Sequence, residues 1–140
     1  MLFRSTPETI AGPVDVVVGD LSFISLRLVL DALLGVTADD GDLALMVKPQ
    51  FEVGKDRVGK GGVVRDLALR AEAVTTIADL AAARGWGAVA VTVSPLPGPS
   101  GNVEFFLLLR RGPAAIDADD IRAEVERAAP LGVASERVDP

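Results

Sequence analysis

The order of four apolar runs is the feature that most constrains the fold. Three short runs are typical of strands covered on both faces in a parallel sheet: Val14 to Val18 (VDVVV), Leu43 to Val47 (LALMV) and Ala88 to Val93 (AVAVTV). A fourth run, Glu104 to Leu109 (EFFLLL), follows the third after only the turn-rich loop SPLPGPSGN. The pattern therefore predicts three strands joined by long connections and one joined by a short loop.

Two helices are predicted between these strands. Apolar residues at helical spacing run from Phe23 to Leu34, with Ser22 as a candidate N-cap and Gly35 as a stop. An Ala-rich periodic stretch from Asp66 to Arg84 is closed by Gly85. The element order is strand, helix, strand, helix, strand, strand.

This order predicts an α/β fold. The first three strands can be parallel through right-handed crossovers, whereas the last is reached too quickly for a crossover and is expected to be antiparallel. We expect the C-terminal half of a Rossmann-like doubly wound sheet, mostly parallel, with the antiparallel strand at its end, as in class I methyltransferases. The strand and Gly-rich turn of the first half have no counterpart before Val14, so the chain is expected to be the C-terminal portion of a longer protein.

Three polar residues are expected to meet at one edge of this sheet. Asp20 lies just past the first strand and Lys48 follows the second directly. Glu104 opens the reversed strand, which begins at the same edge. Ligands of such sheets lie beyond the carboxyl ends of the parallel strands, so these side chains mark a candidate site. The plainer alternatives are a helix cap for Asp20 and a solvated carboxylate for Glu104.

The loop after Lys48 resembles a P-loop but lacks its chemistry. Gly54, four further residues, Gly59 and Lys60 match the glycine and lysine spacing. A true P-loop continues with Ser or Thr, whose hydroxyl binds magnesium, and here Gly61 follows. The glycines are instead expected to form a mobile flap over the site.

The composition excludes several kinds of catalytic site. The chain has no Cys and no His, which excludes thiol nucleophiles, Cys/His zinc sites and imidazole acid/base catalysis, and no metal is expected. The net charge is −6, yet residues 48–70 carry six Lys or Arg against three Asp or Glu, a local charge of +3. This segment is either an ordinary solvated loop or a basic rim for an anionic substrate.

Four stretches resemble the TlyA family when taken in order: DLSFISL (20–26), KPQFEVG (48–54), GGVVRD (61–66) and SPLPGPSGNVEFFL (94–107). The likeness covers roughly residues 7–110. The TlyA family are S-adenosylmethionine-dependent 2′-O-methyltransferases of ribosomal RNA, related to FtsJ-like enzymes and long labelled haemolysins.

The resemblance implies roles for individual residues. The family places a Lys, Asp, Lys, Glu tetrad around the ribose hydroxyl, and the motifs carry its last three members to Asp20, Lys48 and Glu104. The first Lys has no counterpart here. Asp20, Leu21, Ser22 and Phe23 would lie along S-adenosyl-L-methionine, and Phe51 is a weaker candidate for stacking a flipped base. The expected phosphate contacts to ribosomal RNA are Lys55, Arg57, Lys60 and Arg65.

Lys48 has two possible roles in this chemistry. As a general base it would have to lose its own proton first, which requires desolvation or a neighbouring cation. As an ammonium it would instead stabilise the charge developing on the ribose oxygen, with Asp20 orienting the cluster.

The resemblance also sets the expected organisation. Residues 1–6 are expected to be a foreign or disordered start, residues 7–111 the C-terminal part of an FtsJ-like methyltransferase domain, and residues 112–140 a C-terminal helix and tail. The Gly-rich cofactor motif and the RNA-binding domain of the family have no counterpart in this sequence, so the chain is expected to be inactive on its own.

The sequence also suggests where the protein is located and leaves other functions open. The absence of cysteine agrees with a reducing cytoplasm, and the longest apolar runs are too short to span a bilayer. The alternatives are a non-catalytic truncated module, a membrane-acting haemolysin-like protein and a small-molecule methyltransferase. The basic loop favours a phosphate-bearing substrate over the last.

Overall fold

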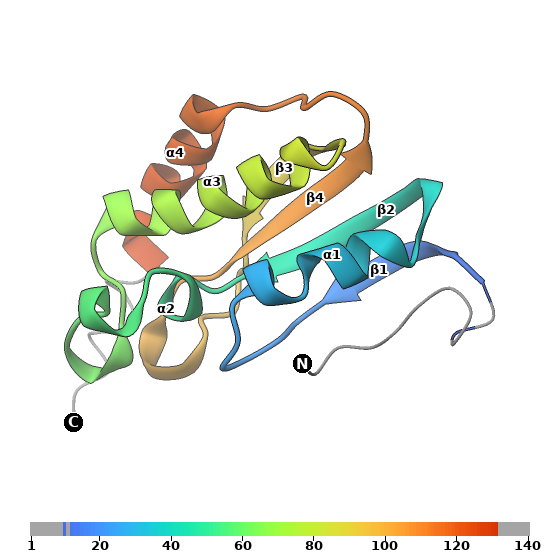
Figure 1. Cartoon of the computed structure of the whole chain (residues 1–140). Helices are drawn as coiled ribbons and strands as arrows, with labels where there is room; N and C mark the ends of the chain where they lie inside the picture. Colours follow the sequence, from blue (N-terminus) through green and yellow to red (C-terminus); the bar gives the residue numbers. More distant parts are fainter. Residues whose placement is uncertain (1–9, 11, 132–140) are drawn as a thin grey trace.

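The computed structural model describes residue 10 and residues 12–131, which form a mixed four-stranded sheet with flanking helices (Figure 1). The expectations for residues 1–6 and for the tail beyond residue 131 lie outside the described residues. The strands are β1 (Val14–Gly19), β2 (Thr37–Val47), β3 (Trp86–Val93) and β4 (Phe105–Arg111). The helices are α1 (Leu30–Gly35), α2 (Pro49–Glu52), α3 (Leu67–Ala83) and α4 (Ala118–Arg127). Short 3-10 turns are η1 (Leu26–Leu28), η2 (Lys55–Arg57), η3 (Lys60–Gly62) and η4 (Pro99–Gly101).

The strand directions agree with the prediction, but the position of the reversed strand does not. The order is β1-β2-β4-β3: β1 and β2 pair in parallel, and β4 pairs antiparallel with both β2 and β3. The expectation that β4 lies at the end of the sheet is therefore wrong. Phe105 pairs with Val47 on one side and Val93 on the other, so β4 fills a gap that the α3 crossover leaves between β2 and β3. In that slot both edges of β4 are paired, and alternate side chains of the strand are fully buried.

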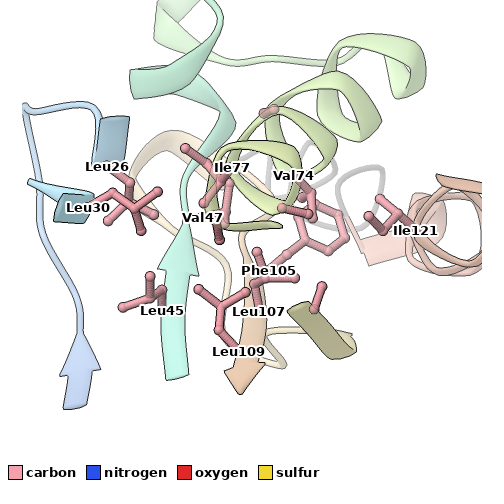
Figure 2. Close-up of a cluster of buried hydrophobic side chains, with 14 of the residues drawn as sticks. Leu26, Leu30, Leu45, Val47, Val74, Ile77, Phe105, Leu107, Leu109 and Ile121 are labelled. Carbon is pink, nitrogen blue, oxygen red and sulfur yellow. The ribbon is translucent and has the colours of Figure 1, made fainter. Parts of the chain in front are cut away.

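The core lies between one face of the sheet and the helices α1, α3 and α4 (Figure 2). Alternate residues of the two central strands point into it, because successive side chains of a strand face opposite ways. These fully buried strand residues are Leu43, Leu45, Val47, Phe105, Leu107 and Leu109. The residues between them on the two strands are only half-buried, so this face is packed more tightly than the other.

β1 departs from the expectation of a strand covered on both faces. It is an edge strand, and Val18 is 71% exposed while Val16 is also exposed. Only one side of the run packs inward, through Val17 against the core cluster. A run of β-branched residues predicts a strand, but its neighbours decide whether both faces are covered.

The first predicted helix is shorter than expected. Phe23 has φ +63°, a left-handed conformation that a helix cannot contain, and helical structure begins only at η1 and α1. Ser25, not Ser22, is the N-cap of η1 and accepts from Arg27 N. Residues 20–25 therefore form an open loop beyond the carboxyl end of β1.

The second predicted helix is confirmed as α3. Asp66 is its N-cap and accepts a hydrogen bond from Ala68 N at 2.8 Å, and Gly85 follows the C-cap Arg84 with φ +85°. The polar helix expected after residue 112 is α4, which buries Ile121 and Val125 against α3 and β3.

Candidate active site

Two parallel strands end where the reversed strand begins, and this edge holds the three predicted residues. Asp20 follows β1 and Lys48 follows β2. Val47 is the register partner of Phe105, so Lys48 and Glu104 are the next residues along the two strands. The topology thus brings residues remote in sequence to one place.

Lys48 is the centre of the site. Its Nζ lies 2.6 Å from Asp20 Oδ1 and donates to Ser22 Oγ at 3.0 Å. The Lys48 side chain is 9% exposed, whereas that of Asp20 is 63% exposed. An ammonium has three hydrogens and no acceptor, so two donors are engaged and one remains for another ligand.

Glu104 is buried beside Lys48, but its carboxylate is held by another residue. Its Oε2 accepts from Gln50 Nε2 at 2.8 Å. Gly98 packs directly against this carboxylate, since a Cβ placed there would overlap Oε2. The structure therefore joins Asp20 to Lys48 by direct contact and sets Glu104 next to them in register.

Gln50 escaped the sequence analysis although it lies within a quoted motif. Its only signal was its position two residues after the strand-end Lys48, which does not reveal what its side chain contacts. The contact with Glu104 joins residues 54 positions apart, and such pairings are fixed by the fold.

The loop that follows β1 presents an aromatic side chain to the outside. Phe23 is 89% exposed, and its ring centroid lies 5.1 Å from that of Phe51. An open cavity of about 660 Å³ lies against this pair, and Gln50, Lys55 and Ser100 also line it. The predicted cofactor residues Leu21 and Ser22 precede Phe23, with Leu21 half-buried and Ser22 exposed.

Glu52 fixes this loop to α2. Its carboxylate accepts from Ser25 Oγ at 2.6 Å and from Leu26 N at 2.8 Å. Burial raises the pKa of Glu52, and these two hydrogen bonds oppose the rise. The contacts connect the segment after Lys48 to the loop after Asp20, a role that the sequence analysis did not assign.

The basic segment is not a uniform positive rim. Arg57 bonds to the Glu72 carboxylate and donates to Val53 O at 2.9 Å. This ion pair lowers the pKa of Glu72.

The other cations of the segment differ in exposure. Arg70 is buried and donates to Val64 O at 2.9 Å. Lys55 and Lys60 are exposed, and Arg65 donates to Lys60 O at 2.9 Å.

Asn102 joins the basic segment to the loop before β4. It is buried, accepts from Val64 N at 3.0 Å, and donates to Gly62 O at 2.8 Å and Pro99 O at 3.2 Å. Gly61 and Gly62 have φ of +74° and +77°, a conformation that favours glycine. The turn η2 lies between Gly54 and Gly59, η3 begins at Lys60, and α3 begins only at Leu67. No helix therefore starts directly after the glycine and lysine pattern, as it does in a P-loop.

Within residue 10 and residues 12–131, no helix is both long and apolar enough to cross a bilayer. Within the same residues, no three or more Asp and Glu side chains gather in a way that could hold a metal ion.

Comparison with known proteins identifies the family. The model of the FtsJ-like methyltransferase family matches residues 2–111. The chain belongs to this family. It is 56% identical over 124 residues to the 16S/23S rRNA (cytidine-2′-O)-methyltransferase TlyA of Mycobacterium tuberculosis, an alignment covering 88% of this chain and 46% of that protein.

Two further proteins are similar to the chain. A Bacillus subtilis protein named "Putative rRNA methyltransferase YqxC" is 42% identical over 90 residues, which cover 64% of this chain and 32% of that one. The solved structure "Putative hemolysin from Streptococcus thermophilus" superposes with a TM-score of 0.85 at 30% identity, covering 94% of this chain and 49% of the other. The chain thus spans about half the length of these relatives or less.

Proposed function

We propose that this chain forms part of an S-adenosylmethionine-dependent enzyme that methylates a ribose 2′-hydroxyl of ribosomal RNA. The observation that carries the proposal is the Lys48–Asp20 contact of 2.6 Å, at a sheet edge that also holds Glu104. Membership of the FtsJ-like family and the name of the M. tuberculosis relative support the reaction and the substrate class.

Lys48 acts in this proposal as a charge stabiliser. Its ion pair with Asp20 is a contact of an ammonium, and an ammonium donates hydrogen bonds only. Its remaining N–H would bind the ribose 2′-oxygen and offset the negative charge that develops there. This arrangement supports the oxyanion role over the role of general base.

Asp20 has two tasks in the same step. One carboxylate oxygen orients the Lys48 ammonium. The exposed Asp20 carboxylate can accept the hydroxyl proton of the ribose as the 2′-oxygen takes up the methyl group that the cofactor would supply.

The residues present fit the cofactor in the part of its site that they would form. When bound, S-adenosylmethionine supplies a methyl group already activated by its sulfonium. Residues Asp20 to Phe23 lie beyond the carboxyl end of β1, with an exposed carboxylate and an aromatic ring that described residues leave largely uncovered. Such an edge suits a ligand with an ammonium group and a flat apolar ring.

The RNA would be held by the basic segment. Lys55, Lys60 and Arg65 are exposed, Lys55 also lines the cavity, and all three would contact phosphates. Arg57 would have to exchange Glu72 for a phosphate oxygen. A ribosomal substrate also places the proposed activity in the cytoplasm.

The exposed edge of the sheet supports a further part of the proposal. β1 leaves one edge unpaired and the outer faces of Val16 and Val18 uncovered within the described residues. We expect the other half of the methyltransferase sheet to cover this apolar surface and to complete the cofactor site. The described domain alone would then bind cofactor poorly and transfer no methyl group.

The test is methyl transfer by the full-length protein to purified small and large ribosomal subunits. Methyl-labelled S-adenosylmethionine should deliver label to a ribose, detected as a nucleotide linkage that resists alkaline hydrolysis. An RNA with 2′-deoxyribose at the mapped nucleotide is the control and should accept none. Label found only on bases, or on no RNA at all, would refute the proposed reaction. Calorimetric titration of the isolated chain with S-adenosylmethionine should give no binding heat.

A further inference from the structure

The Gln50 carboxamide holds an unsatisfied polar atom at the edge of the site. Its Oε1 is fully enclosed and has no hydrogen-bond partner, and it is the only such buried side-chain atom in the described part of the chain. Buried acceptors in proteins are nearly always paired, so an isolated one calls for a donor that arrives from elsewhere.

The orientation of this amide is fixed by its surroundings. Nε2 must face Glu104 because an ionised carboxylate only accepts hydrogen bonds, and the separation is 2.8 Å. Oε1 is then the amide atom that does not bond to Glu104. One side chain thus holds the Glu104 carboxylate through its nitrogen and keeps an unpaired acceptor at its oxygen.

The backbone of Gln50 is equally constrained. It is the second residue of α2, which starts with Pro49 directly after Lys48. Phe51 N donates to Lys48 O at 2.9 Å and Val53 N donates to Pro49 O at 3.1 Å, so one helical turn sets the side-chain direction. Gln50 is therefore a rigid bridge between the Lys48 segment and Glu104.

Gly98 also packs against the Glu104 carboxylate. A side chain at this glycine would overlap the carboxylate, so Gly98 and the Gln50 amide together limit the space that it can occupy. The hydrogen bond from the Gln50 amide is the contact that fixes the rotation of this carboxylate.

We propose that Gln50 is a positioning residue of the methyl-transfer site, holding Glu104 with its N–H while its carbonyl accepts an N–H or O–H from the substrate nucleotide. Gln50 also lines the cavity of about 660 Å³ together with Phe51 and Lys55, a ring and a cation suited to a nucleotide. The inference rests on the proposed function and adds to it a residue that selects and orients the substrate.

The experiment compares two substitutions in the full-length protein. Gln50→Leu removes both hydrogen-bonding groups and should lower kcat/KM for methyl transfer to ribosomal subunits by about tenfold to a hundredfold, because small misplacements at a reacting centre have effects of that size. The affinity for S-adenosylmethionine should stay within about twofold, as should the activity of the control Asp119→Asn on the exposed face of α4.

Gln50→Glu tests the positioning role through the pH dependence of methyl transfer, which a purely structural role would leave unchanged. At pH 8 the introduced carboxylate faces that of Glu104 and should suppress activity, since like charges repel. As the pH falls toward 5.5, protonation restores an O–H donor to Glu104 and a free carbonyl. Over this pH range the activity of Gln50→Glu, relative to that of the unsubstituted protein, should rise. The relative activity of Gln50→Leu should not change with pH.

The outcomes separate the two proposals. If unsubstituted protein methylates no RNA, the proposed function itself fails. If unsubstituted protein is active and Gln50→Leu keeps kcat/KM within twofold, the positioning role is wrong. Identical pH profiles for the two variants, relative to the parent, would also overturn it.

Discussion

Lys48 Nζ and Asp20 Oδ1 are 2.6 Å apart, and the pair links the carboxyl ends of the adjacent parallel strands β2 and β1. The cation is buried and the carboxylate is mostly exposed, so the pair presents its open side to a ligand. Replacing Lys48 therefore removes a functional group while leaving the outer carboxylate hydrated.

Lys48→Ala in the full-length protein should reduce methyl transfer to ribosomal RNA by about a hundredfold to a thousandfold, the usual effect of losing one donor to a developing oxyanion. Binding of S-adenosylmethionine, measured by calorimetry, should remain largely intact. Lys48→Arg keeps the positive charge and should retain more activity than Lys48→Ala. Equal losses in the two variants would argue against charge stabilisation, and near-normal rates in Lys48→Ala would remove Lys48 from the mechanism.

The salt dependence of RNA binding should distinguish cations that contact phosphate from one that is already paired. Lys60→Ala is expected to reduce the slope of log K against log salt by about 1, as for the loss of one phosphate contact. Arg57→Ala should change it less because Glu72 already neutralises Arg57. Glu72→Gln is the matched partner variant and should strengthen RNA binding. Fluorescence anisotropy over a salt series provides the measurement, and equal slopes for all three variants would contradict the assignment.

Glu52 should make stability depend on pH in a defined direction. Its folded-state pKa is raised above the ordinary 4.5 by burial. Below about pH 4.5 the carboxyl is neutral in both folded and unfolded states. As the pH rises through the raised folded pKa, the folded state has to hold a partly buried charge, and stability from this group is lost. Urea unfolding should show Glu52→Gln gaining stability relative to unsubstituted protein as pH rises from about 4.5 to 7.

Glu52→Ala serves as the control for this prediction. It removes the acceptor of Leu26 N and should destabilise the protein by about 1–3 kcal/mol, the usual effect of leaving a buried donor unpaired. A stability difference between Glu52→Gln and unsubstituted protein that is independent of pH would show that the carboxyl does not titrate differently in the folded state.

Replacement by alanine should have different effects on stability at Gly98 and Gly35. Gly98→Ala places a methyl group against the Glu104 carboxylate and should destabilise the protein by about 1–3 kcal/mol and displace Glu104. Gly35→Ala, at the end of α1, meets no atom within 4 Å and should leave stability unchanged or raise it by about 0.4–1 kcal/mol. Thermal unfolding of both variants checks the contrast. A neutral Gly98→Ala would mean that the carboxylate is free to move.

The sequence predicted the elements because their signals are local. The Asp66 cap, the Ala-rich periodicity and Gly85 are adjacent in the chain, and they gave α3 with its ends. The apolar runs likewise gave the four strands. The first helix was misplaced because Phe23 fits the periodicity while its backbone, held by contacts such as Glu52 with Leu26, takes a left-handed conformation.

What the sequence alone determined is the set of strand ends at which Asp20, Lys48 and Glu104 stand, since a strand and the polar residue after it are read directly from the chain. The tertiary structure decided the rest: the insertion of β4 between β2 and β3, the exposure of β1, and the pairing of Gln50 with Glu104. Each depends on which elements become neighbours once all of them compete for one core, and hydrogen bonds between residues far apart in the sequence form only after that competition is resolved.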